Sequence, residues 1–157
     1  MRTPIAAGLL LSVFVVTGCH KAVEIDQSAK PVGNRWNATL ATPAGLSGAI
    51  QVTGTAWMAV NEKDPSTTEA HVEIANASPG GLHPWHVHRG QCGSDQGIVG
   101  PPDTYKPLKV GGNGQAKDDV ILAMPVPKEG AYFVNVHASA ANMGTIVACG
   151  NLAPPSR

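Results

Sequence analysis

The chain has 157 residues and a formal net charge of zero at pH 7, and only 14% of its residues are charged. If an N-terminal signal carrying Arg2 is removed, ten basic residues remain against eleven acidic ones, and they are scattered rather than clustered. This pattern gives no indication of a nucleic-acid-binding face or of a polybasic membrane surface.

The first 18 residues predict a signal peptide. One early charge, Arg2, is followed by an apolar run from Ile5 to Val16, which is shorter than the roughly 20 residues of a membrane-spanning helix. The run ends in Val-Thr-Gly before Cys19, which resembles the bacterial lipobox. We therefore expect export, with Cys19 lipid-modified and anchored to a membrane of the bacterial cell envelope. An ordinary secretory signal is the alternative.

Residues 19–35 lack sustained periodicity and contain Pro and Gly, so we interpret them as a flexible tether. Residues 36–157 then form one domain of a size that suits a single core.

Short apolar runs rich in β-branched residues recur along this domain, and helical periodicity is nearly absent. Turns rich in Pro, Gly and Asn separate them, which is typical of an all-β sandwich or flattened barrel. The predicted strands are Trp36–Ala41, Ile50–Val60, Thr68–Ala75, His83–His88, Val120–Met124, Ala131–Ala138 and Thr145–Cys149. The segment from Arg89 to Lys109 is predicted to be irregular, and a loop of that length is usually functional or covalently pinned.

Three histidines are candidate metal ligands. Side chains alternate along a strand, so His86 and His88 share one face while Trp85 and Val87 occupy the other. In the later strand the same alternation places His137 on the face opposite Val136. If the two strands are neighbours, His137 would complete a cluster of three imidazoles.

The sequence Gly-Leu-His-Pro-Trp-His-Val-His at 81–88, a following cysteine, a distant Val-His and a late Ala-Cys-Gly resemble the copper/zinc superoxide dismutases. The resemblance covers roughly residues 36 to 152 and implies a Greek-key β-barrel. It implies that His86, His88 and His137 are copper ligands and that His83 is a structural histidine. It also matches Cys92 and Cys149 to the intrachain disulfide of that family.

The chain also departs from that family. No histidine lies between His88 and His137, where the family keeps its metal-bridging histidine and its zinc ligands. Ile146 stands where the active enzymes carry the arginine that guides superoxide, and the intervening loops are shorter. The resemblance therefore implies a degenerate or remodelled member that binds one metal ion and has no zinc site.

The cysteine count agrees with the implied disulfide. The chain has three cysteines, and lipidation of Cys19 would leave Cys92 and Cys149 as a pair in an oxidising compartment. Binding of metal by two thiolates is the alternative for this pair.

Ligand chemistry favours copper. Three neutral imidazoles with open positions suit Cu(II) or Zn(II), and the Irving–Williams order gives copper the higher affinity.

Six further residues are candidates for a supporting role at the metal site. Met143 has a thioether that suits Cu(I), with simple packing as its alternative; Asn135 shares the face of His137 and is a candidate for orienting a ligand. Arg89 follows the first ligand strand and is a candidate substitute for the guiding arginine, with a surface role as the alternative. The nearby oxygen donors are Asp95, Asp103 and Tyr105. His71 is interpreted as a solvent-face residue.

The sequence is compatible with three functions. One is weak or residual copper-dependent superoxide dismutation by an anchored domain. The second is a non-catalytic scavenger or carrier of copper ions in the envelope, on the periplasmic or cell-surface side. The third is a structural interaction domain with an abandoned site, which the retained histidines disfavour. A shared fold cannot decide among them.

Overall fold

The computed structural model describes residues 34–46 and 51–155. The predicted signal peptide, the lipidation site at Cys19 and nearly all of the predicted tether lie outside these residues. In the described part of the chain, no helix is both long and apolar enough to cross a membrane.

Strands make up most of the described chain, as the turn-separated apolar runs predict. They are β1 (Trp36–Ala41), β2 (Thr53–Val60), β3 (Thr68–Ala75), β4 (Leu82–His83), β5 (Trp85–Gln91), β6 (Ser94–Ile98), β7 (Leu108–Lys109), β8 (Ala116–Leu122), β9 (Tyr132–Ser139) and β10 (Asn142–Leu152). A 3-10 helix, η2, spans Pro102–Thr104.

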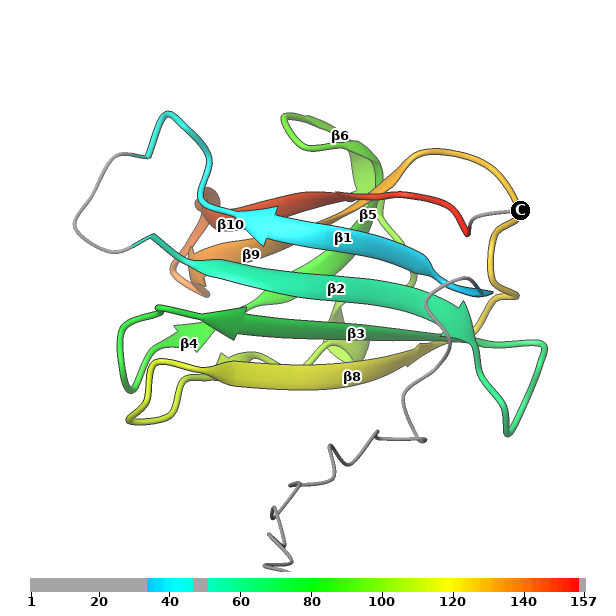
Figure 1. The fold of residues 1–157 in the computed structure, drawn as a ribbon, viewed down its shortest axis with the longest axis horizontal. Coiled ribbons are helices and arrows are strands. Elements are labelled where there is room, and N and C mark those ends of the chain that lie inside the picture. Colours follow the sequence, from blue (N-terminus) through cyan, green and yellow to red (C-terminus); the bar gives the residue numbers. More distant parts are fainter. Residues whose placement is uncertain (1–33, 47–50, 156–157) are drawn as a thin grey trace, which may run out of the picture.

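Eight strands form one antiparallel sheet in the order β6-β5-β9-β10-β1-β2-β3-β8. The sheet curls, so that β1, β2, β3 and β8 lie side by side while β5 crosses behind them (Figure 1). The connections from β3 to β5 and from β6 to β8 cross between these two parts of the sheet. The architecture is thus the predicted all-β curled barrel, with the small β4–β7 pair beside it.

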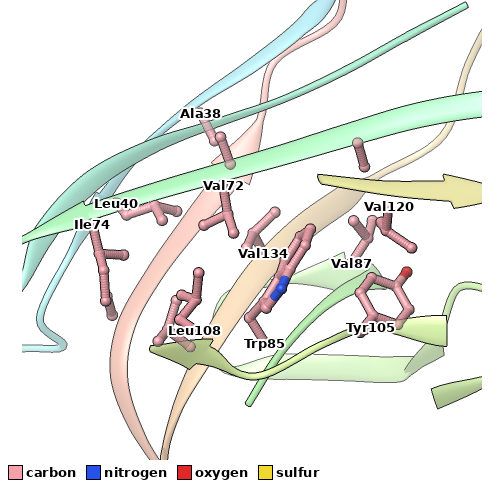
Figure 2. Close-up of a cluster of buried hydrophobic side chains, with 14 of the residues drawn as sticks. Ala38, Leu40, Val72, Ile74, Trp85, Val87, Tyr105, Leu108, Val120 and Val134 are labelled. Carbon is pink, nitrogen blue, oxygen red and sulfur yellow. The ribbon is translucent and has the colours of Figure 1, made fainter. Parts of the chain in front are cut away.

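The core fills the inside of this curl. Val72 and Ile74 of β3 face Trp85 and Val87 of β5, and Val134 of β9 packs among them (Figure 2). Burying a side chain of this size contributes about 1.5–3 kcal/mol. Because Trp85 and Val87 are fully buried, strand alternation forces their neighbours on β5 to point away from the core.

Several predicted bounds were imprecise. The bounds of β1 and β3 match the prediction, but β8 begins at Ala116 rather than Val120. Ala116 and Val120 are both buried, while the charged residues between them face outward or lie half-buried and hide the alternation. The first ligand strand also continues beyond His88, to Gln91.

The segment predicted to be irregular, Arg89 to Lys109, contains β6, η2 and β7. The β6 strand is mostly exposed, polar and glycine-containing, so it carries no apolar alternation from which it could be predicted. Gly90 makes the turn into it possible. Its φ is +98°, and a Cβ at this position would collide with the carbonyl oxygen of Ser94.

The disulfide between Cys92 and Cys149 is present, as the family resemblance implied, with 6.0 Å between the two Cα atoms. It ties the β5–β6 turn to β10. The backbone N–H of Cys92 also donates to the side-chain oxygen of Asn151 at 2.7 Å. The turn that follows the first ligand strand is therefore held at two points.

Candidate metal centre

His86 and His88 lie on one face of β5 and are 6% and 3% exposed. Their ring centroids are 5.8 Å apart. The opposite face of the strand carries Trp85 and Val87, which are buried in the core. The position of the two imidazoles thus follows from the strand period and from the burial of their neighbours.

His137 joins them from β9. The register pairs His86 with Asn135, and the backbone N–H of His137 donates to the carbonyl of Pro84 at 2.8 Å. The His137 ring lies 5.3 Å from that of His86 and 6.2 Å from that of His88. One ring nitrogen of each histidine lies within 4.8 Å of the other two, and all three residues are buried.

The hydrogen bonds of the cluster orient two of these rings. His137 directs Nδ1 at the carbonyl oxygen of Met143, 2.6 Å away, and His88 directs Nδ1 at the Asp95 carboxylate, 2.9 Å away. A carbonyl and a carboxylate accept, so each Nδ1 donates and each Nε2 keeps a lone pair. The two Nε2 atoms are therefore available as ligands.

Burial favours the neutral form of His86 and His137. It lowers the pKa of His86 from 6.5 to about 4, with further lowering from the nearby His137 and His88. Burial also lowers the pKa of His137, against a raising contribution from its bond to Met143. Neutral imidazole is the metal-binding form, so little protonation of these two histidines opposes a metal ion at pH 7.

Two observations show that this donor set fits a metal ion. Nε2 of His88 is buried and has no hydrogen-bond partner among the described residues. Nδ1 of His86 lies 3.3 Å from Nε2 of His137. Metal–nitrogen bonds of about 2.0–2.1 Å at tetrahedral angles place two ligand nitrogens about 3.3 Å apart.

His83 lies beside the cluster without joining it. Its Nδ1 is 2.9 Å from the carbonyl oxygen of His137 and bonds the backbone of a ligand strand. The accepting carbonyl belongs to β9. His83 therefore links the small β4 strand to the backbone that carries His137.

The predicted oxygen donors occupy different places. The rings of Tyr105 and His86 meet in a T-shaped arrangement with centroids 5.1 Å apart, but the Tyr105 hydroxyl donates to the carbonyl of Val99 at 2.7 Å. Burial raises the pKa of Tyr105, so it stays a neutral phenol. Asp103 is exposed in η2. Asp95 is the one of the three whose carboxylate accepts a hydrogen bond from a histidine of the cluster.

The accessory candidates also separate. Asn135 is buried beside His86, and its Oδ1 has no partner among residues 34–46 and 51–155. Met143 is 38% exposed, and it contacts the cluster through its carbonyl oxygen. Arg89 is exposed at the end of β5, where alternation places it on the face opposite His88.

Ile146 lies directly across from His137 in the β9–β10 pair. It lines a hollow of about 530 Å³ together with the disulfide and the apolar side chains of Pro43 and Leu46. At the position where the resemblance places a guiding arginine, this chain therefore has an uncharged aliphatic side chain.

Sequence reasoning did not identify two contacts of the cluster. The carbonyl of Met143 orients His137, and the Phe133 ring stacks on His88 with centroids 5.0 Å apart. Strand alternation puts Phe133 on the same face of β9 as His137, so the sequence pattern did hold a signal for the second contact. The first depends on the turn between β9 and β10, which has no readable pattern.

No protein-family model matches the chain, and no curated protein matches it. Among solved structures it is similar to a double mutant of a SOD-like protein from Bacillus subtilis, whose two substitutions each introduce a histidine. The TM-score is 0.51 at 16% identity, over 74% of this chain and 95% of that one.

The chain has a superoxide dismutase-like fold. At this identity the similarity concerns the fold, and the chemistry rests on the residues of this chain. Within the superoxide dismutase-like fold, the three-histidine cluster could hold a metal ion.

Proposed function

We propose that this protein is an exported, lipid-anchored copper-binding protein with a superoxide dismutase-like fold and weak superoxide dismutation. The observation that carries the proposal is the buried cluster of His86, His88 and His137, in which Nε2 of His88 has no hydrogen-bond partner among the described residues. A buried polar atom without a partner costs about 1–3 kcal/mol, and a bound ion would relieve that cost.

The donor set favours copper. Three neutral nitrogen ligands with an open position are accepted by both Cu(II) and Zn(II), and copper binds such sites more tightly. No second cluster of three or more candidate ligands is found among the described residues, so one ion per chain is proposed. Bound copper would supply one-electron chemistry toward superoxide, while the histidines hold the ion and the core behind β5 keeps them in place.

The surroundings of the cluster favour a cation over an anion. Ile146 provides no positive charge next to His137. The Asp95 side chain is 52% exposed beside His88. Partial burial raises its pKa, but hydrogen bonds from Gly97 and His88 lower it on balance, so the carboxylate is ionised at neutral pH. A negative charge here attracts metal ions and repels superoxide.

Export is supported by two features. The predicted signal peptide and Cys19 lie outside the described residues, and they remain a prediction from the sequence. The Cys92–Cys149 disulfide agrees with them, because such bonds persist in oxidising compartments such as the bacterial periplasm.

A non-catalytic copper scavenger or carrier is the second candidate function. The charge at Asp95 and the missing positive charge at Ile146 favour it. Both candidates predict copper binding, and they differ only in turnover.

The test is a superoxide assay on the purified, disulfide-oxidised full chain after its copper content has been measured. We expect a rate constant far below the diffusional ceiling of roughly 10⁸–10⁹ M⁻¹s⁻¹, with little increase as salt is lowered. A rate near that ceiling that falls with ionic strength would show an efficient enzyme and overturn the proposal of weak turnover. Absence of copper binding would overturn both candidate functions.

A further inference from the structure

The contact between Asp95 and His88 joins an exposed carboxylate on β6 to a buried imidazole on β5. Oδ1 of Asp95 lies 2.9 Å from Nδ1 of His88, and the two side chains are 52% and 4% exposed. An isolated surface ion pair contributes little, about 0–1 kcal/mol. Here, however, the ring on the other side of the bond belongs to the candidate metal centre.

The carboxylate is held in place by a backbone N–H of its own strand, β6. The backbone N–H of Gly97 donates to the same Oδ1 at 2.7 Å, and Gly97 has a φ of +104°, which favours glycine. Three residues before Asp95, Cys92 is bonded to Cys149 of β10. The disulfide thus fixes the turn that precedes β6, and the Gly97 bond fixes the carboxylate within β6.

The His88 ring is fixed on three sides. Nδ1 donates to Asp95, the ring face stacks on Phe133, and the strand backbone sets the direction of the side chain. The remaining nitrogen, Nε2, is buried and unpartnered in the described part of the chain. This nitrogen is the one available to the cluster with His86 and His137.

We propose that Asp95 is a positioning residue for the metal centre, which selects the His88 tautomer with a free Nε2 and holds the ring toward the ion. A carboxylate that accepts from the second nitrogen of a ligating histidine orients the ring and makes it a stronger ligand. This inference rests on the proposed metal binding but makes a separate claim about Asp95.

The structure supplies a matched control. Asp119 of β8 makes the same kind of bond, 2.6 Å long, to Nδ1 of His71 on β3. That histidine stacks on Trp57, outside the candidate centre. Asp119→Ala therefore removes a carboxylate–histidine bond and a negative charge without touching the cluster.

The experiment measures Cu(II) dissociation constants by chelator competition for the full chain and for Asp95→Ala, Asp95→Asn and Asp119→Ala. Loss of such a partner typically weakens metal binding 10–100-fold, which is the expectation for Asp95→Ala. Asp95→Asn keeps an oxygen that can accept from Nδ1, so it should lose less. Asp119→Ala should bind as the wild type does.

A spectroscopic readout separates positioning from a general loss of structure. The electron paramagnetic resonance spectrum of bound Cu(II) should change in Asp95→Ala and stay unchanged in Asp119→Ala. Titration of free thiols checks that the disulfide is intact in each variant. If Asp95→Ala fails to fold, Asp95→Asn still provides the comparison of affinity and spectrum.

The outcomes are distinguishable. If wild type binds copper, and Asp95→Ala and Asp95→Asn both match it in affinity and spectrum, the positioning role is wrong while the proposed function stands. If Asp95→Ala and Asp119→Ala lose Cu(II) affinity equally, the loss reflects only the change in net charge, and the inference is also overturned. If wild type binds no copper, the proposed function itself fails, and the inference fails with it.

Discussion

Ile146 faces His137 directly across the β9–β10 pair, so the residue beside a candidate metal ligand is an uncharged aliphatic one. A positive charge next to a binding site raises association rates of anions by about 10–10³-fold. Because Ile146 is uncharged, this position supplies no electrostatic attraction for superoxide.

Restoring a charge at this position should raise turnover. We expect copper-loaded Ile146→Arg to react with superoxide at least tenfold faster than wild type at low salt, with the gain shrinking as salt screens the charge. Stopped-flow decay of superoxide measures it. Ile121→Arg, at an exposed position on β8, adds the same charge elsewhere and should have little effect. Equal rates in wild type and both variants would show that attraction of the anion does not limit the reaction.

The disulfide should contribute strongly to stability. It joins residues 57 apart in the sequence, and loss of such a bond typically costs about 2–5 kcal/mol. Cys92→Ser should therefore lower the free energy of unfolding by that amount in denaturant titrations under oxidising conditions. Wild type treated with reductant should unfold like the variant. Equal midpoints for oxidised wild type and variant would contradict the expectation.

The metal-free protein should lose stability on acidification. The pKa of His86 falls from 6.5 to about 4 because of burial and the nearby histidines, so the folded state binds fewer protons than the unfolded state between these values. This part of the stability is complete above pH 6.5 and is lost progressively toward pH 4. Denaturant titrations across that range measure it. His86→Gln cannot titrate and should show a shallower slope, whereas an unchanged slope would contradict the assignment to His86.

If Cys19 carries lipid, its removal should change the cell fraction in which the protein is found. Cys19→Ser should move the exported protein from the membrane fraction to the soluble fraction, because the tether would carry no acyl chains. Immunoblots of separated fractions measure this. The Cys92→Ser variant keeps the lipid site and should remain with membranes. Continued membrane association of Cys19→Ser would show that another feature holds the protein there.

Strand alternation carried most of the predictable information. The bounds of β1 and β3 were predicted because their buried and outward positions alternate in residue type. The same rule placed His86 and His88 on one face and His137 on the matching face of β9. That β5 and β9 are neighbours came from the family resemblance, since long-range pairing leaves no local signal.

What could not be predicted depends on local backbone conformation. The bond from Asp95 to His88 requires β6 to pair with β5, with Gly97 at positive φ. The bond from His137 to the Met143 carbonyl requires the β9–β10 turn, where β10 begins at Asn142 rather than at the predicted Thr145. Residue types alone named Asp95 and Met143 as candidates without giving either contact.

The measurement that tests the account most directly is metal stoichiometry. The purified, disulfide-oxidised full chain should bind one Cu(II) per chain in equilibrium dialysis with excess copper and zinc. His88→Ala should weaken that binding by at least about tenfold, because Nε2 of His88 is the buried unpartnered ligand atom, and His71→Ala should not. Failure to bind copper, binding of two ions with zinc in one site, or unchanged affinity in His88→Ala would contradict the account.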